Sequence, residues 1–154
     1  MSCRPMLVLM LLAPAMAAAQ RQPERNEIYA QRILRELVRR HHDEVSAMEL
    51  ALATGGRCVT IAATDPKDIG EKCDADELGP IRTGAPTIEA PTSADPVFDI
   101  TQALHDKSGR LIGALGTDVI PTANGDRAVA LARAEALRRE LEALIPSAAA
   151  LSKR

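Results

Sequence analysis

Aromatic residues are nearly absent from this chain of 154 residues, which has no tryptophan, one tyrosine and one phenylalanine. Proteins that bind nucleic acid combine clusters of lysine and arginine with stacking rings, and no such patch occurs here. The sequence therefore argues against a nucleic-acid-binding protein and against an aromatic-lined pocket.

Signatures of catalysis and of cofactor attachment are also lacking. The chain has no Gly-x-Ser-x-Gly, no His-Glu-x-x-His, no phosphate-binding glycine loop, no zinc-type cysteine pattern and no Cys-x-x-Cys-His. His41 and His42 are adjacent, and adjacent residues of a helix do not share a face, so they make a poor metal site. We expect no enzyme activity, no cofactor and no metal.

Long apolar runs are missing except at the N-terminus. Arg4 precedes an apolar run from Met6 to Met16, and Ala17-Ala18-Ala19 follows as a small-residue cleavage site. This pattern predicts a signal peptide over 1–19 and a polar leader over 20–26. The alternative is an uncleaved anchor, but the run contains a proline and is shorter than the ~20 residues of a spanning helix. We therefore expect a periplasmic or secreted protein with no membrane span after cleavage.

Only three cysteines are present, and Cys3 lies within the predicted signal peptide. The remaining two, Cys58 and Cys73, form an even pair in a chain expected to reach an oxidising compartment. Such a pair predicts one disulfide. The alternative is two buried free thiols, because the sequence does not give their geometry.

The excess of negative charge is small. Removing Arg4 with the signal peptide leaves 18 basic residues against 21 acidic ones, a net charge of about −3. Six acids gather between positions 65 and 77, where a calcium loop is one interpretation. Their spacing does not follow Asp-x-Asp-x-Asp-Gly, so we favour a solvated acidic loop held by the disulfide.

Hydrophobic periodicity outlines an α+β domain over 27–146. Apolar residues recur at helical spacing between Glu24 and Ala53, which predicts one long N-terminal helix that ends at Gly55-Gly56. The expected strands are 57–64, 87–90, 97–105 and 110–120, and the expected C-terminal helix is 126–145. Pro146 ends that helix, and 147–154 is expected to be a flexible tail.

The two strands 97–105 and 110–120 are predicted to form a hairpin around the turn 106–109, with Gly109 at a positive φ. Antiparallel pairing then places Asp99 opposite Gly116 and Thr101 opposite Ala114. Asp118 lies on the same face, so small residues and carboxylates surround a space. The other face collects the apolar residues expected to pack on a helix: Phe98, Ile100, Leu104, Leu111, Leu115 and Val119. A one-residue bulge near Gly113 or Gly116 would exchange the two faces.

This hairpin resembles the last hairpin of Cache domains, the extracytoplasmic, PAS-like sensor domains of bacterial chemoreceptors and kinases. The resemblance rests on ordered short motifs over the middle half of the chain: Thr64-Asp65-Pro66, Ile69-Gly70, Thr83-Gly84, and Asp106, Gly109, Ile112, Gly113, Leu115, Gly116 and Asp118. It implies a PAS-like single Cache domain with a long N-terminal helix, a central antiparallel sheet and a C-terminal helix.

The resemblance also implies a ligand site. Asp118 matches the aspartate with which many Cache domains hold a ligand ammonium group, whereas their arginine–tryptophan–tyrosine signature is absent, which argues against an amino acid. Arg82 lies in the segment that caps the pocket in such domains, where it could clamp a carboxylate, although a lone loop arginine is more often exposed. The predicted ligand-binding residues are Asp118, Asp99, Thr101, Gly116 and Arg82.

The predicted function is a periplasmic small-molecule binding or sensing module without an output domain in this sequence. An amine or a small organic acid is the expected ligand, and a membrane sensor protein is the expected partner. One alternative is an envelope structural or interaction protein that keeps the fold without a ligand, and another is an exported enzyme.

Overall fold

A single antiparallel sheet of five strands organises the protein. The computed structural model describes residues 27–154, so the predicted signal peptide and leader lie outside the described residues. The chain runs through the following elements: α1 (Tyr29–Arg40), β1 (Val45–Thr54), β2 (Arg57–Ala63), α2 (Ala75–Thr83), β3 (Thr87–Glu89), β4 (Phe98–His105), β5 (Leu111–Val119), α3 (Arg127–Leu144) and α4 (Ala148–Leu151). The order of the strands across the sheet is β2-β1-β5-β4-β3, with every pair antiparallel.

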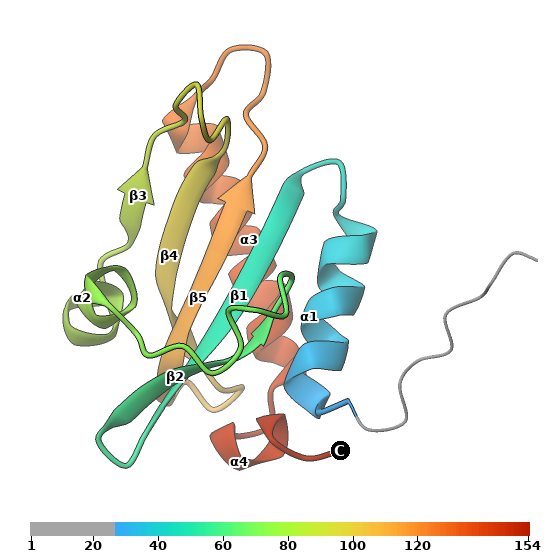
Figure 1. Ribbon diagram of the computed structural model, residues 1–154, viewed down its shortest axis with the longest axis vertical. Helices are drawn as coiled ribbons and strands as arrows, with labels where there is room; N and C mark the ends of the chain where they lie inside the picture. The colour runs from blue at the N-terminus through green and yellow to red at the C-terminus, as the bar shows by residue number, and fades with distance from the viewer. Residues whose placement is uncertain (1–26) are drawn as a thin grey trace, which may run out of the picture.

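Helices cover the two faces of this sheet unequally. The long helix α3 lies behind the strands with α1 beside it, whereas the shorter α2 and the loop before it lie in front (Figure 1). The core lies between the sheet and the pair α1–α3, and it includes Leu34, Leu50, Leu115 and Leu141, all fully buried. The α+β class, the antiparallel sheet and the C-terminal helix agree with the sequence-based prediction.

The predicted helix from Glu24 to Ala53 is wrong in its second half. The helix α1 ends at Arg40, and Val45–Thr54 forms β1, which pairs with β2 on one edge and β5 on the other. Met48, Leu50 and Leu52 recur two apart, a strand signal that the four-apart spacings upstream obscured. Pairing on both edges of β1 decides the structure, because tertiary context overrides local periodicity.

Gly55 and Gly56 therefore do not end a helix. They form the tight turn between β1 and β2 with φ of +61° and +77°. Two consecutive positive φ values are typical of the type I′ turn, whose twist matches that of the flanking strands.

The hairpin of β4 and β5 is confirmed, but its predicted register is wrong by two residues. Asp99 lies opposite Asp118, and Thr101 lies opposite Gly116. One residue of the shift arises at the turn, and the second arises at an irregularity between Leu104 and His105. Because a shift of two restores the alternation of side chains, Asp99, Thr101, Gly116 and Asp118 still share one face.

The irregularity between Leu104 and His105 does change the burial of two side chains near the turn. Leu111, which was predicted to belong to the core, is 42% exposed, whereas Ile112 is 3% exposed and belongs to the core cluster. The bulge therefore changes the burial of its neighbours without changing the face that carries the carboxylates.

The segment 147–154 is not a flexible tail over its whole length. It contains the short helix α4, and the side chain of Leu151 is fully buried against the core. The backbone N–H of Tyr29 donates to the carbonyl of Lys153 at 2.6 Å. The domain thus extends beyond the predicted boundary at 146, because α4 covers the end of α1.

Candidate functional site

The open face of the sheet carries an acidic recess of about 350 Å³. Its floor is formed by β1, β5 and β4, and its walls are formed by α2 and the loop between β2 and α2. Its lining residues are Ala47, Met48, Glu49, Thr64, Asp65, Asp68, Asp74, Asp76, Glu77, Asp99, Thr101, Gly116 and Asp118. Eight of these thirteen residues are aspartate or glutamate and none is lysine, arginine or histidine. We call this site the acidic recess.

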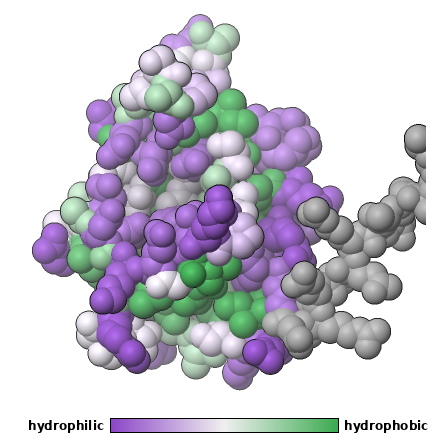
Figure 2. All heavy atoms as spheres, viewed as in Figure 1, coloured by the Kyte–Doolittle hydropathy of each residue, from purple (hydrophilic) through white to green (hydrophobic). Residues whose placement is uncertain are grey.

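The molecular surface agrees with this lining. In Figure 2, hydrophilic residues dominate the middle of the face that looks toward the viewer, and a more apolar group lies below them. This polar, negatively charged opening differs from most small-molecule sites, which are lined mainly by apolar side chains.

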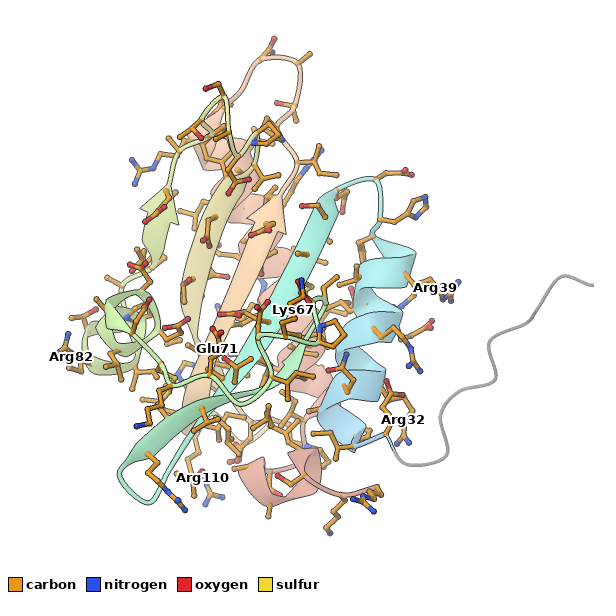
Figure 3. All side chains as sticks on the ribbon, in the orientation of Figure 1. Arg32, Arg39, Lys67, Glu71, Arg82 and Arg110 are labelled. Carbon is orange, nitrogen blue, oxygen red and sulfur yellow. A yellow bond between two sulfur atoms is a disulfide. The ribbon has the colours of Figure 1, made fainter. Side chains whose placement is uncertain are left out.

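Four of the five predicted ligand residues meet in this recess. Asp99 and Thr101 come from β4, and Gly116 and Asp118 come from the directly paired positions of β5. Arg82 does not join them. Its Nε donates to the carbonyl of Leu78 at 3.1 Å, and its side chain points outward from α2, away from the sheet (Figure 3).

Glu49 is the site residue that the sequence analysis missed. It pairs with Gly116 in the β1–β5 ladder, and its side chain lies across that glycine, so that a Cβ at position 116 would be 2.9 Å from the Glu49 Cγ. Gly116 thus leaves room for a carboxyl group from the neighbouring strand. The strand-like spacing of Met48, Leu50 and Leu52 was the available signal, because it places Glu49 on the opposite face from these apolar residues.

Burial and mutual repulsion perturb three carboxyl groups on the floor of the recess. Desolvation and the neighbouring Glu77 raise the pKa of Glu49 from its ordinary 4.5 to about 8. Desolvation, followed by the charge of Asp118, raises the pKa of Asp99 from 3.8 to about 6. Desolvation and the charge of Asp95 raise the pKa of Asp118 as well. Like charges held together without a counter-charge disfavour ionisation.

The acidic wall of the recess belongs to α2 and to its N-terminal cap. The side chain of Asp74 accepts from the backbone N–H of Asp76 at 2.8 Å, and Glu77 accepts from the backbone N–H of Asp74 at 2.8 Å. This reciprocal capping box fixes the start of α2, which the sequence analysis had treated as loop. The cap therefore positions these carboxylates at the recess.

A disulfide ties the loop before α2 to the sheet. Cys58 and Cys73 are bonded, with their Cα atoms 5.3 Å apart, as the sequence predicted. The same loop also bonds to the edge of β2, where the N–H of Thr60 donates to Glu71 at 2.9 Å and the N–H of Gly70 donates to Thr60 at 2.8 Å. These contacts cover the edge of β2 and hold the loop in front of the sheet.

The nearest basic residue of this loop lies outside the lining. Lys67 projects from the front of the loop (Figure 3), its side chain is 88% exposed, and its Nζ is 3.8 Å from Asp65. Such an exposed pair contributes little energy. It does not neutralise the floor of the recess.

Within residues 27–154, no group of three or more histidine, cysteine, aspartate and glutamate side chains has the arrangement of a metal site. Over the same residues, no helix has the length and apolar character needed to cross a membrane.

Comparison with known proteins gives similarity at the level of the fold. No family model matches the chain, and no curated protein matches it in sequence. One similar solved structure is the GAF domain of a two-component sensor histidine kinase from Bacillus halodurans, with a TM-score of 0.56 and 11% identity over 77% of this chain and 95% of that one. Another is the Agobacterium tumefaciens repressor BlcR, with a TM-score of 0.50 and 13% identity over 79% of this chain and 68% of that one.

These similarities define the class of fold. The protein has a GAF- and PAS-like α+β fold, with helices α1 and α3 on one face of a five-stranded antiparallel sheet. At 11–13% identity the similarity concerns the fold alone, so the function must be argued from the acidic recess itself.

Proposed function

We propose that this protein is a small-molecule-binding sensor module and that its ligand carries a positive charge into the acidic recess. The observation that carries the proposal is the lining itself, with eight carboxyl groups and no basic side chain. A cation entering the recess would relieve the repulsion that raises the pKa values of Glu49 and Asp99. A small organic acid, the other ligand class that the sequence left open, would meet like charge.

The fold supports a sensing role by analogy. The two structures named above are the GAF domain of a sensor histidine kinase and a repressor, and both names indicate regulation. We propose that this chain is likewise not an enzyme, that it is exported as its first 19 residues suggest, and that it reports ligand occupancy to a membrane sensor protein. A specific relationship to single Cache domains remains part of this proposal, and it is supported by the hairpin motif around Gly116 and Asp118.

The alternative is an envelope interaction protein with this fold and no ligand. The gathering of eight carboxyl groups in one recess without a basic side chain favours a ligand site over this alternative. Perturbed carboxyl groups in a recess are typical of functional sites.

A thermal-shift screen tests the proposal. The full chain would be expressed with its export segment, purified in the oxidised form and melted with amines, amino acids, small carboxylates, purines and divalent cations. A ligand at a hundredfold excess over its dissociation constant stabilises the fold by about 2.7 kcal/mol. We expect stabilisation by amines and none by carboxylates.

Two variants locate the effect. The response to amines should be lost in Asp118→Asn and kept in Glu71→Gln, which alters an exposed acid outside the lining. If no compound stabilises a protein that unfolds cooperatively, the interaction protein becomes the better interpretation.

A further inference from the structure

The carboxyl groups on the floor of the acidic recess fall into two sets. Asp99 and Asp118 face each other across β4 and β5, and they form the first set. Glu49 belongs to β1, two pairs further along the β1–β5 ladder, and with Glu77 it forms the second set. The negative charge of the floor is therefore distributed along the strands rather than concentrated at one point.

The register of the strands gives the separation of the two sets. Asp118 pairs with Ala47, and Glu49 pairs with Gly116, so Asp118 and Glu49 are diagonal neighbours on adjacent strands. Diagonal neighbours in an antiparallel pair lie about 7–8 Å apart. Two ammonium groups joined by a short chain match this spacing.

The hydroxyl group of Thr101 adds an acceptor at the Glu49 end. Thr101 is 6% exposed and lines the recess, and within the described chain its hydroxyl makes no hydrogen bond to another residue. Thr101 pairs with Gly116, over which the Glu49 side chain lies. The oxygen is not among the fully buried side-chain atoms that lack a partner, so it is accessible from the recess and can accept from a ligand donor beside Glu49.

A metal ion fits this arrangement less well than an organic dication. Calcium and magnesium need several oxygen atoms converging at about 2.0–2.6 Å from one centre. The described carboxyl groups do not converge in this way. Charge spread over two sets instead matches a ligand with two separated charges.

We propose that the acidic recess selects linear aliphatic diamines in their doubly protonated form. One ammonium group lies between Asp99 and Asp118, and the other donates to Glu49 and to the hydroxyl of Thr101. Methylene groups between them span the floor of the recess from Asp118 to the Glu49 side chain, which lies over Gly116. This inference rests on the proposed function and specifies its ligand class.

Titration calorimetry at pH 8.5 tests the inference with 1,4-diaminobutane, 1,5-diaminopentane, n-butylamine and calcium chloride. At this pH alkylammonium groups, like that of lysine, keep their protons, and the Glu49 carboxyl is mostly ionised. We expect the diamines to bind the full-length oxidised protein about tenfold more tightly than butylamine, because they make a second charge contact. Calcium should bind more weakly than either diamine.

Variants of the second set separate this inference from the proposed function. Glu49→Gln and Thr101→Val should reduce diamine affinity toward that of butylamine and leave butylamine binding unchanged, whereas Asp118→Asn should weaken both. Glu71→Gln serves as the matched control and should change neither.

Each other outcome overturns this inference, either alone or together with the proposed function. If butylamine binds as tightly as the diamines, or if Glu49→Gln weakens both equally, the two-set arrangement is wrong while a cation site stands. Tighter binding of calcium than of any amine would replace the diamine by a metal ion. If no amine binds while the protein is folded, the cation-binding function fails together with this inference.

Discussion

Asp99 and Asp118 lie directly opposite each other on β4 and β5, and both line the acidic recess. Like charges at directly opposed positions of a sheet are destabilising. The protein carries this pair next to Glu49, with no basic side chain in the lining. The arrangement costs stability in the free protein and is relieved when a proton or a cation is bound.

The first prediction concerns pH. The pKa of Glu49 rises to about 8 and that of Asp99 to about 6 in the folded protein, so the folded state binds these protons more tightly than the unfolded chain does. Their contribution to stability is therefore complete below about pH 4 and is lost as pH rises through 6 and then 8. The melting temperature measured by circular dichroism should fall between pH 5 and 9.

Glu49→Gln isolates the upper part of this change. The amide should stabilise the free protein at pH 9 by about 1–2 kcal/mol, a value reduced for the solvent screening of a partly exposed group. Glu71→Gln should leave the pH profile unchanged. A Glu49→Gln profile parallel to that of the unmodified chain would show that Glu49 titrates normally.

The second prediction contrasts two glycines of β5. A Cβ at Gly113 would lie 1.9 Å from the backbone oxygen of Ala51, whereas a Cβ at Gly116 would lie 2.9 Å from the side-chain Cγ of Glu49. Gly113→Ala should therefore destabilise the protein by about 3 kcal/mol in denaturant unfolding, since the backbone of β1 must move. Gly116→Ala should cost less and should weaken amine binding, because only the Glu49 side chain is displaced. Equal losses of stability would contradict this assignment.

The third prediction concerns the disulfide. Replacing Cys58 and Cys73 by serine should lower the unfolding free energy by about 3 kcal/mol, the value expected for closing a loop of fifteen residues. Affinity for amines should fall as well, because the freed loop carries Asp65 and Asp68 of the recess. Chemical reduction of the unmodified protein should reproduce both effects. Unchanged affinity would show that this loop does not contribute to the site.

The fourth prediction tests whether the C-terminal segment belongs to the domain. Leu151 is fully buried, so Leu151→Ala should cost about 2–4 kcal/mol in denaturant unfolding. The control is Leu144→Ala, which alters a leucine that is 39% exposed and should change stability by less than about 1 kcal/mol. If Leu151→Ala leaves the unfolding free energy unchanged, the segment 147–154 does not contribute to the stability of the domain.

The fifth prediction concerns Thr117, whose side chain is 1% exposed and whose hydroxyl has no hydrogen-bond partner in the described structure. Valine has nearly the same shape and lacks the polar atom. Thr117→Val should raise the melting temperature, with a gain of about 1 kcal/mol in the unfolding free energy. A lower melting temperature would mean that a buried water molecule satisfies the hydroxyl in solution.

Local sequence signals predict several elements of the fold. Asp126 caps α3 by accepting from the N–H of Ala128, and an alanine- and leucine-rich stripe continues that helix. The turn at Asp106–Gly109 and the β-rich segments around it predicted the hairpin. These signals depend on neighbours within a few residues, so they survive without knowledge of the rest of the fold.

The sequence alone determined the α+β class, the carboxylate-bearing face of the hairpin and the cysteine pair, because alternation along a strand and cysteine count are local properties. Only the tertiary structure decided that 45–54 is a strand rather than a helix, since pairing with both β2 and β5 outweighs its helical spacing. The pairing of β1 with β5 places Glu49 over Gly116 and beside Asp99 and Asp118 in the acidic recess. It depends on residues more than 60 positions apart, which no local pattern encodes.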